Sequence, residues 1–135
     1  MEVNINMADL DDFTRRIVVD KLEIAITMVE SAIIKNMSGA NGEDLKWVDT
    51  GFEMNTVTHD VNADLLEART GPNTNYAIWG EFGTGIYAEN GDGRQDGWVY
   101  KDENGFHHTM GTRPRPAIRR GLYDNLDNIR KIFAI

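Results

Sequence analysis

The chain contains no cysteine, and this absence removes several kinds of chemistry at once. A chain without cysteine forms no disulfide, offers no thiolate ligand to zinc and has no cysteine nucleophile. Serine is nearly as scarce: only Ser31 and Ser38 occur, and neither lies in the Gly-x-Ser-x-Gly pattern of a serine hydrolase. The sequence therefore gives no support to thiol or serine catalysis, and its lack of cysteine fits a reducing compartment.

Long apolar runs are also missing. No stretch approaches the roughly 18 apolar residues that are needed to span a membrane. The first twelve residues, MEVNINMADLDD, are acidic and contain no basic segment followed by an apolar one. We therefore expect neither a signal peptide nor a membrane partner.

Basic residues are outnumbered, 14 against 22 acidic ones, which gives a formal net charge of −8. An acidic chain repels nucleic acid at long range, whereas proteins that grip DNA phosphates usually carry a basic face. The one dense basic cluster is RPRPAIRR, with Arg113, Arg115, Arg119 and Arg120. We interpret this cluster as an edge that docks onto an acidic protein surface. The alternative is that Arg119 and Arg120 are simply solvated residues of the last helix.

The 135 residues, 41% of them hydrophobic and 27% charged, predict a single domain that spans residues 1–135. Residues 9–38 predict a long helix, because apolar residues recur at steps of three and four, and Gly39 suits the left-handed position after it. Residues 116–133 show the same spacing and predict a second helix. The two stripes are Val18, Leu22, Ala25, Ile26, Val29, Ile33 and Met37, and Ile118, Leu122, Leu126, Ile129 and Phe133.

The middle of the chain predicts strands. NTVTHDV and LLEART, residues 55–61 and 65–70, flank a turn, and WVYK and FHHT flank an Asn-Gly turn that favours a hairpin. Polar residues 86–97 and the first eight residues predict flexible segments. The expected fold is α+β: a long N-terminal helix and a C-terminal helix packed on a small, mainly antiparallel sheet with an extended hairpin.

The stretch NYAIWGEFGTGIY, residues 75–87, is the most distinctive candidate site. Its first part predicts a short helix with Tyr76, Trp79 and Phe82 on one face, docked into the core. The glycines do not open a helix and no lysine follows them, so a structural turn is favoured over a phosphate-binding loop. Glu81 could act as a general base if buried, but we favour a structural role in which it caps a turn or pairs with Arg113 or Arg119.

No metal or other cofactor is expected. His107 and His108 are adjacent on a predicted strand and point to opposite faces, so they cannot jointly bind one metal ion, although His59 could join one of them. The acidic loop AENGDGRQDG lacks the ligand spacing of a calcium-binding EF-hand. Solvated histidines on a hairpin edge are the favoured interpretation.

The order of motifs is more specific than any one of them. VDTGFEMNTV, TNYAIWGEFGTG, GWVYKDENGFHHTMG and RPRPAIRRGLYDN, followed by a helix, resemble the small head–tail joining proteins of long-tailed bacteriophages and prophages. The resemblance covers about residues 8–133. The positions that match the family's first two motifs are Thr50, Gly51, Tyr76, Ala77, Glu81, Phe82, Gly83, Thr84 and Gly85. Arg115, Pro116 and Ala117 match the start of the third, which then departs at Arg120-Gly121, where Pro-Ala is usual.

The resemblance implies a non-enzymatic subunit of the phage neck. Such a subunit would form a homo-oligomeric ring between the head connector and the tail tube or tail terminator, assembled in the host cytoplasm and found in the virion. DNA would pass through the ring without specific binding, as the acidic charge favours. A tail terminator and, in another class, a small enzyme or regulator that uses Glu81 and a histidine remain the alternatives.

Overall fold

The computed structural model describes residues 1–4, 6–47 and 50–134, and its longest element is α1, Met7–Ser38. Helix α1 confirms the long helix predicted at residues 9–38. Its stripe is buried at Ala25, Ile26, Val29, Ile33 and Met37. Gly39 has φ +85°, the left-handed conformation expected after a helix. The segment WVDTG also predicts that Val48 is buried and that Asp49 begins a turn or a short helix, but both residues lie outside the described part of the chain.

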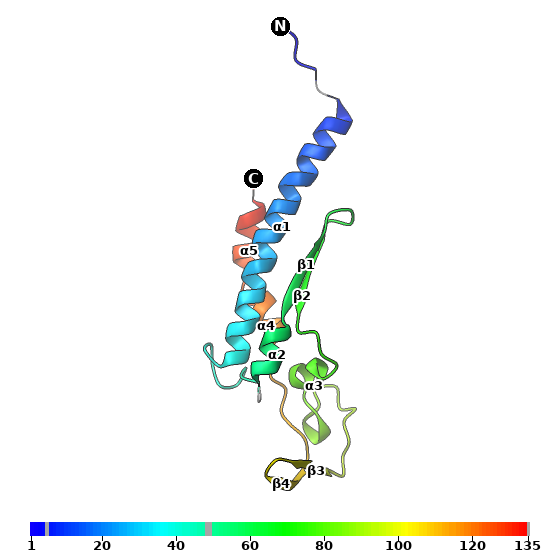
Figure 1. Ribbon diagram of the computed structural model, residues 1–135, viewed down its shortest axis with the longest axis vertical. Helices are drawn as coiled ribbons and strands as arrows, with labels where there is room; N and C mark the ends of the chain where they lie inside the picture. Colours follow the sequence, from blue (N-terminus) through cyan, green and yellow to red (C-terminus); the bar gives the residue numbers. More distant parts are fainter. Residues whose placement is uncertain (5, 48–49, 135) are drawn as a thin grey trace.

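The predicted C-terminal helix is divided into two, α4 (Ala117–Tyr123) and α5 (Leu126–Phe133), with the break at Asp124 and Asn125. Both helices lie along α1 (Figure 1). Gly121 is the point of closest approach, because a Cβ there would lie 2.5 Å from Ile33 Cγ1. The expected place of Leu122 in the apolar stripe is wrong, because its side chain on α4 is 41% exposed.

One buried amide fastens α1 to α4. Asn36, which is 3% exposed, donates its amide N–H to the carbonyl oxygen of Ala117 at 2.9 Å and accepts a hydrogen bond from Asn41 at 2.7 Å. The hydrophobic core includes residues of both helices. Its buried members are Val29, Ile33, Met37, Trp47, Val57 and Ala117.

A first hairpin, β1 (Thr58–Asn62) and β2 (Glu67–Gly71), lies against the side of α1 (Figure 1). The prediction of two strands here is confirmed, but the first begins later than expected, because helix α2 (Thr50–Thr56) takes residues 55 and 56. The hairpin is fastened by His59, whose two ring nitrogens each lie 2.7 Å from a carboxylate of α1, one from Glu23 and one from Glu30.

This arrangement predicts a pH-dependent stability. Hydrogen bonds to Glu23 and then Glu30 raise the pKa of His59 above its ordinary value. Because the folded state holds the proton more tightly than the unfolded state, the stabilisation is complete below the unfolded pKa of about 6.5 and is lost as the pH rises through the folded pKa. We expect the melting temperature of the native protein to exceed that of His59→Gln by more at about pH 6 than at about pH 9. An equal difference at both pH values would contradict a charged His59 bridge.

The remaining elements lie beyond the C-terminal end of α1, at the end of the molecule opposite to its N-terminus (Figure 1). They are α3 (Ala77–Phe82), the short helical turn η1 (Gly85–Tyr87), and a second hairpin, β3 (Trp98–Asp102) and β4 (Gly105–Thr109). The second hairpin confirms the Asn-Gly turn prediction, with Tyr100 opposite His107. The fold is α+β as expected. In the described part of the chain, the strands form two separate two-stranded antiparallel sheets in place of the single sheet that was expected.

Candidate functional site

Glu81 is the buried acid of the candidate site, with 3% of its surface exposed. Its carboxylate leaves α3 and meets the first turn of α4. One oxygen accepts the backbone N–H of Ile118 at 2.9 Å, and the other accepts the backbone N–H of Arg119 at 2.8 Å. N–H groups in the first turn of a helix lack intrahelical partners and carry its positive dipole end. Glu81 therefore caps α4 across a gap of 37 residues in sequence.

Arg119 completes this contact. Its guanidinium donates to the Glu81 carboxylate at 3.0 Å and, on the other side, to both carboxylate oxygens of Glu89 at 3.0 and 2.9 Å. It also lies over the Phe82 ring, 4.7 Å from the ring centroid. The hydrogen bond to Glu89 is the largest cause that raises the pKa of Arg119, with Glu81 adding to it. Of the two arginines considered for Glu81, the structure pairs it with Arg119 and not with Arg113.

Glycines allow the chain that follows α3 to pack closely against residues 110–112. Thr84 and Thr112 bond through backbone and side-chain atoms, and Ile86 donates its N–H to the Met110 carbonyl oxygen at 3.0 Å. The two segments approach so closely that a Cβ on Gly85 would lie 1.9 Å from that same oxygen. We call residues 83–86 and 110–112 the glycine junction. The three glycines of EFGTG and MGT thus serve close backbone contact, as expected of a structural turn.

The prediction that Tyr76, Trp79 and Phe82 together dock α3 into the core is wrong for two of the three. Tyr76 and Trp79 are 54% and 57% exposed, and only Phe82 is half-buried, beneath Arg119. The core contact of α3 is made instead by Ala77, which packs against the buried cluster, and by Gly80, whose α-carbon leaves room for the Trp47 ring. The small side of α3 therefore faces inward and its aromatic side faces outward.

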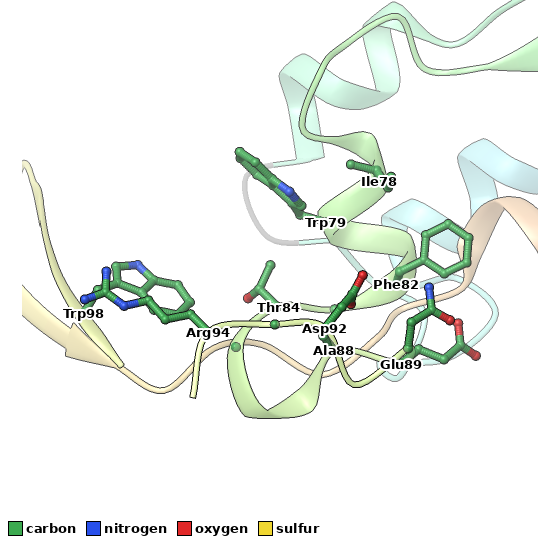
Figure 2. A pocket seen from close by; sticks show the side chains of 13 residues that line it. Ile78, Trp79, Phe82, Thr84, Ala88, Glu89, Asp92, Arg94 and Trp98 are labelled. Atoms are coloured by element: carbon green, nitrogen blue, oxygen red, sulfur yellow. The ribbon is translucent and has the colours of Figure 1, made fainter. Parts of the chain in front are cut away.

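Trp79 stands between two hollows that share Thr84 and Trp98 as further lining residues. Figure 2 shows the first, of about 620 Å³, with Trp79 and Ile78 above it and Trp98 of β3 at the far side. Its charged lining residues are Glu89, Asp92 and Arg94.

The second hollow, of about 580 Å³, we call the aromatic groove. Its charged lining residues are Glu53, Arg113 and Arg115, and Glu53 accepts a hydrogen bond from Thr74 at 2.7 Å. Its aromatic lining residues are Trp47, Phe52, Tyr76, Trp79 and Trp98. The two hollows therefore differ in charge, although both are mainly apolar.

The structure does not bring the four arginines of the predicted docking edge together as one surface. Arg115 donates its guanidinium N–H to the Lys46 carbonyl oxygen and its backbone N–H to Gly80, so it holds α3 in place. Arg119 is committed to the two glutamates, and Arg120 pairs with Asp124 at 3.0 Å on the exposed side of α4. Arg113 is exposed and lies 4.8 Å above the Tyr87 ring, at the rim of the aromatic groove.

The remaining motif positions and histidines are placed as follows. Thr50 and Gly51 begin α2, and Gly51 is exposed with open space around its α-carbon. His107 donates a ring N–H to the Asp102 carboxylate at 2.8 Å and stacks on Tyr100, while His108 is exposed on the other face of the hairpin. Among the described residues no three histidine, aspartate or glutamate side chains gather in a geometry that suits a metal ion. The segment 86–97 is held at Glu89 by Arg119; its flexibility stays a prediction.

Sequence reasoning missed two features of this site. The exposure of Trp79 had a signal in the sequence. The small residues Ala77 and Gly80 lie together on one side of α3, and that side can face the core in place of the aromatic side. The role of Glu89 had no signal in the sequence, because Glu89 lies in a polar loop without a distinctive pattern.

Within the described part of the chain no helix is long and apolar enough to cross a membrane. Comparison with known protein families, with curated proteins and with solved structures finds no match.

Proposed function

We propose that the chain is a virion structural protein of a long-tailed bacteriophage or prophage, a ring subunit that joins or completes the tail at the head–tail interface. The proposal starts from the order of motifs in the sequence. One structural observation supports it: the most distinctive motif, residues 75–87, builds an exposed aromatic surface on a rigid support. Solvent-exposed aromatic residues beside an apolar groove are typical of protein–protein contacts.

The state of Glu81 favours this class over a carboxylate-dependent enzyme. A general base must bring a carboxylate oxygen within reach of a substrate, whereas Glu81 is 3% exposed. Both oxygens of Glu81 already accept hydrogen bonds from the first turn of α4, and one of them also accepts from the Arg119 side chain. Among the described residues, its hydrogen-bond partners include no histidine. The hydrogen bonds of Glu81 fix the position of α3 relative to α4, and therefore the position of Trp79 on α3.

The elongated shape fits a subunit that contacts neighbours at both ends. The start of α1 extends beyond the other helices at one end, and the second hairpin projects at the other (Figure 1). Isolated two-stranded hairpins are marginally stable on their own. Val99 and Phe106 of this hairpin are 62% and 76% exposed, so contact with a neighbouring protein would cover apolar surface. The partners proposed are further copies of the chain, the head connector, and the tail-tube or tail-terminator protein.

Removal of the gene from the phage or prophage that encodes it tests the proposal. We expect filled heads and separate tails of normal length, with infectivity restored by the gene supplied in trans. Electron microscopy of the lysate, with antibody labelling of complete particles at the head–tail junction, is the measurement. Tails of irregular length would indicate a tail terminator instead. Normal particles without the protein would contradict both roles.

A further inference from the structure

We propose that the exposed apolar stripe at the start of α1 docks into the aromatic groove of a second copy of the chain, so that copies associate head to tail. The contact itself stands on the geometry below. Only the closure of the associated copies into a ring rests on the proposed function. For that ring, the inference identifies the two surfaces that meet between neighbouring subunits.

The stripe is the second apolar face of α1. Its members are Leu10, Phe13, Ile17 and Ile24, which are 46%, 62%, 40% and 59% exposed. Steps of three, four and seven residues place these side chains on one side of a helix. That side is opposite to Arg15, which donates to the carbonyl oxygens of Ala63 and Asp64 in the turn of the first hairpin. Helix α1 thus uses one face for its own chain and presents a second apolar face to solvent.

Charge selects the aromatic groove as the acceptor. The segment that carries the stripe, residues 7–24, has a surplus of acids: Asp9, Asp11, Asp12, Asp20 and Glu23 against Arg15, Arg16 and Lys21. The charged lining residues of the aromatic groove are Glu53, Arg113 and Arg115, one acid against two bases, whereas those of the other hollow beside Trp79 are Glu89, Asp92 and Arg94, two acids against one base. A stripe on a segment of net negative charge therefore meets opposite net charge in the aromatic groove and like net charge in the other hollow. Such complementarity fixes which surfaces meet and in which orientation.

The two surfaces cannot meet within one chain. The groove lies beyond the C-terminal end of α1, where Trp47 donates its N–H to the Met37 carbonyl oxygen. Leu10 and Met37 are 27 residues apart on one helix, which separates them by about 40 Å at 1.5 Å per residue. The stripe of one copy must therefore fill the groove of another. A contact between two different patches is heterologous, and it yields a ring when the rotation closes.

A mixing experiment tests the direction of the contact. The donor-defective variant is Leu10→Gln with Phe13→Gln, and the acceptor-defective variant is Trp79→Gln. Tyr123→Gln, at the end of α4, is a control with similar exposure outside both surfaces. We expect each defective variant to self-associate more than about thirtyfold more weakly than the native protein, the loss typical of central interface residues. Mixed together, they should form a one-to-one dimer that does not grow, because each supplies the surface that the other lacks. Analytical ultracentrifugation measures both results.

Disulfide trapping extends the test to weak association, and the cysteine-free chain gives it a clean background. Leu10→Cys mixed with Tyr76→Cys should yield a cross-linked heterodimer under mild oxidation. Leu10→Cys mixed with Tyr123→Cys should yield at least severalfold less. Arg113→Glu, a change at an exposed side chain, should reduce the trapped product of the first pair by about tenfold, since it replaces attraction to the acidic stripe by repulsion.

Three results would overturn the inference: native self-association in Trp79→Gln, no dimer in the mixture of defective variants, or equal trapping by the two cysteine pairs. Loss of association only in the α1 variant would indicate that two copies of α1 pair with each other. These outcomes are separate from the proposed function. Rings that form through other surfaces would leave the neck role standing, and head-to-tail association of a protein absent from virions would leave the contact standing.

Discussion

Glu81→Ala is expected to lower the free energy of unfolding by about 3 kcal/mol. Removal of one partner from a buried ion pair commonly costs about 3–5 kcal/mol, because the other charge is left uncompensated. The lower end applies here, since Arg119 is 31% exposed at its side chain and keeps its bonds to Glu89. The loss also leaves the backbone N–H groups of Ile118 and Arg119 without their acceptor. Urea unfolding followed by circular dichroism measures the change.

Glu89→Ala is the matched control, because it removes the other carboxylate from the same guanidinium. Glu89 is 42% exposed at its side chain, and exposed ion pairs contribute less than about 1 kcal/mol. The prediction therefore requires a large difference between two glutamates that bind one arginine. Similar losses in both variants would mean that the arginine pairing, and not the capping of α4, stabilises this region.

The change in Glu81 is also expected to reach the aromatic surface. Glu81 and Trp79 lie on the same short helix, α3. Without the carboxylate that bonds α3 to α4, we expect α3 to shift relative to Trp98. We expect Glu81→Ala to weaken head-to-tail association below its own melting temperature, although residue 81 does not line the aromatic groove. Ultracentrifugation at low temperature, where the variant is folded, separates this effect from unfolding.

Gly85→Ala is expected to cost about 3–5 kcal/mol of folding stability. Gly85 has φ +61°, a left-handed conformation that costs other residues about 1–3 kcal/mol. Its Cβ would also overlap the Met110 carbonyl oxygen and the Gly111 α-carbon, and overpacking adds about 1–3 kcal/mol more. The obstacle is backbone on both sides, so no side-chain rotation relieves it. The glycine junction would have to open.

Gly91→Ala separates the two costs. Gly91 has φ +70°, but a Cβ there meets nothing within 4 Å. This variant therefore bears the conformational cost alone, and we expect a loss of about 1 kcal/mol. Thermal unfolding of both variants is the measurement. A loss for Gly85→Ala no larger than that for Gly91→Ala would show that the close contact in the glycine junction does not stabilise the protein.

The elements that sequence predicted well are those whose signal is local. Helix α1 follows from a stripe of apolar residues between Val18 and Met37, and the second hairpin follows from one Asn-Gly pair between two short strands. Neither needs information from elsewhere in the chain. The C-terminal helix was predicted by the same rule, yet its break at Asp124 and Asn125 carries no glycine or proline to signal it.

The candidate site could be predicted only in part. The structural role of Glu81 followed from sequence, because the glycines around it do not open a helix and no catalytic partner is fixed nearby. Which arginine it meets did not follow, since Arg113 and Arg119 are both more than thirty residues away. The outward side of α3 was predicted wrongly for a related reason. A spacing of three groups Tyr76, Trp79 and Phe82 on one side, but it does not say which side the core will cover.

The sequence by itself determined the long helix, the tight hairpin and hence the α+β class, because the signal for each of these elements depends on neighbours within a few residues along the chain. Only the tertiary structure decided that Glu81 caps α4, that Arg119 joins two glutamates, and that Trp79 faces solvent beside an aromatic groove. Those outcomes depend on which surfaces meet when the elements pack. Which surfaces meet depends on the shape and burial of the whole core, and the sequence of a single segment does not contain that information.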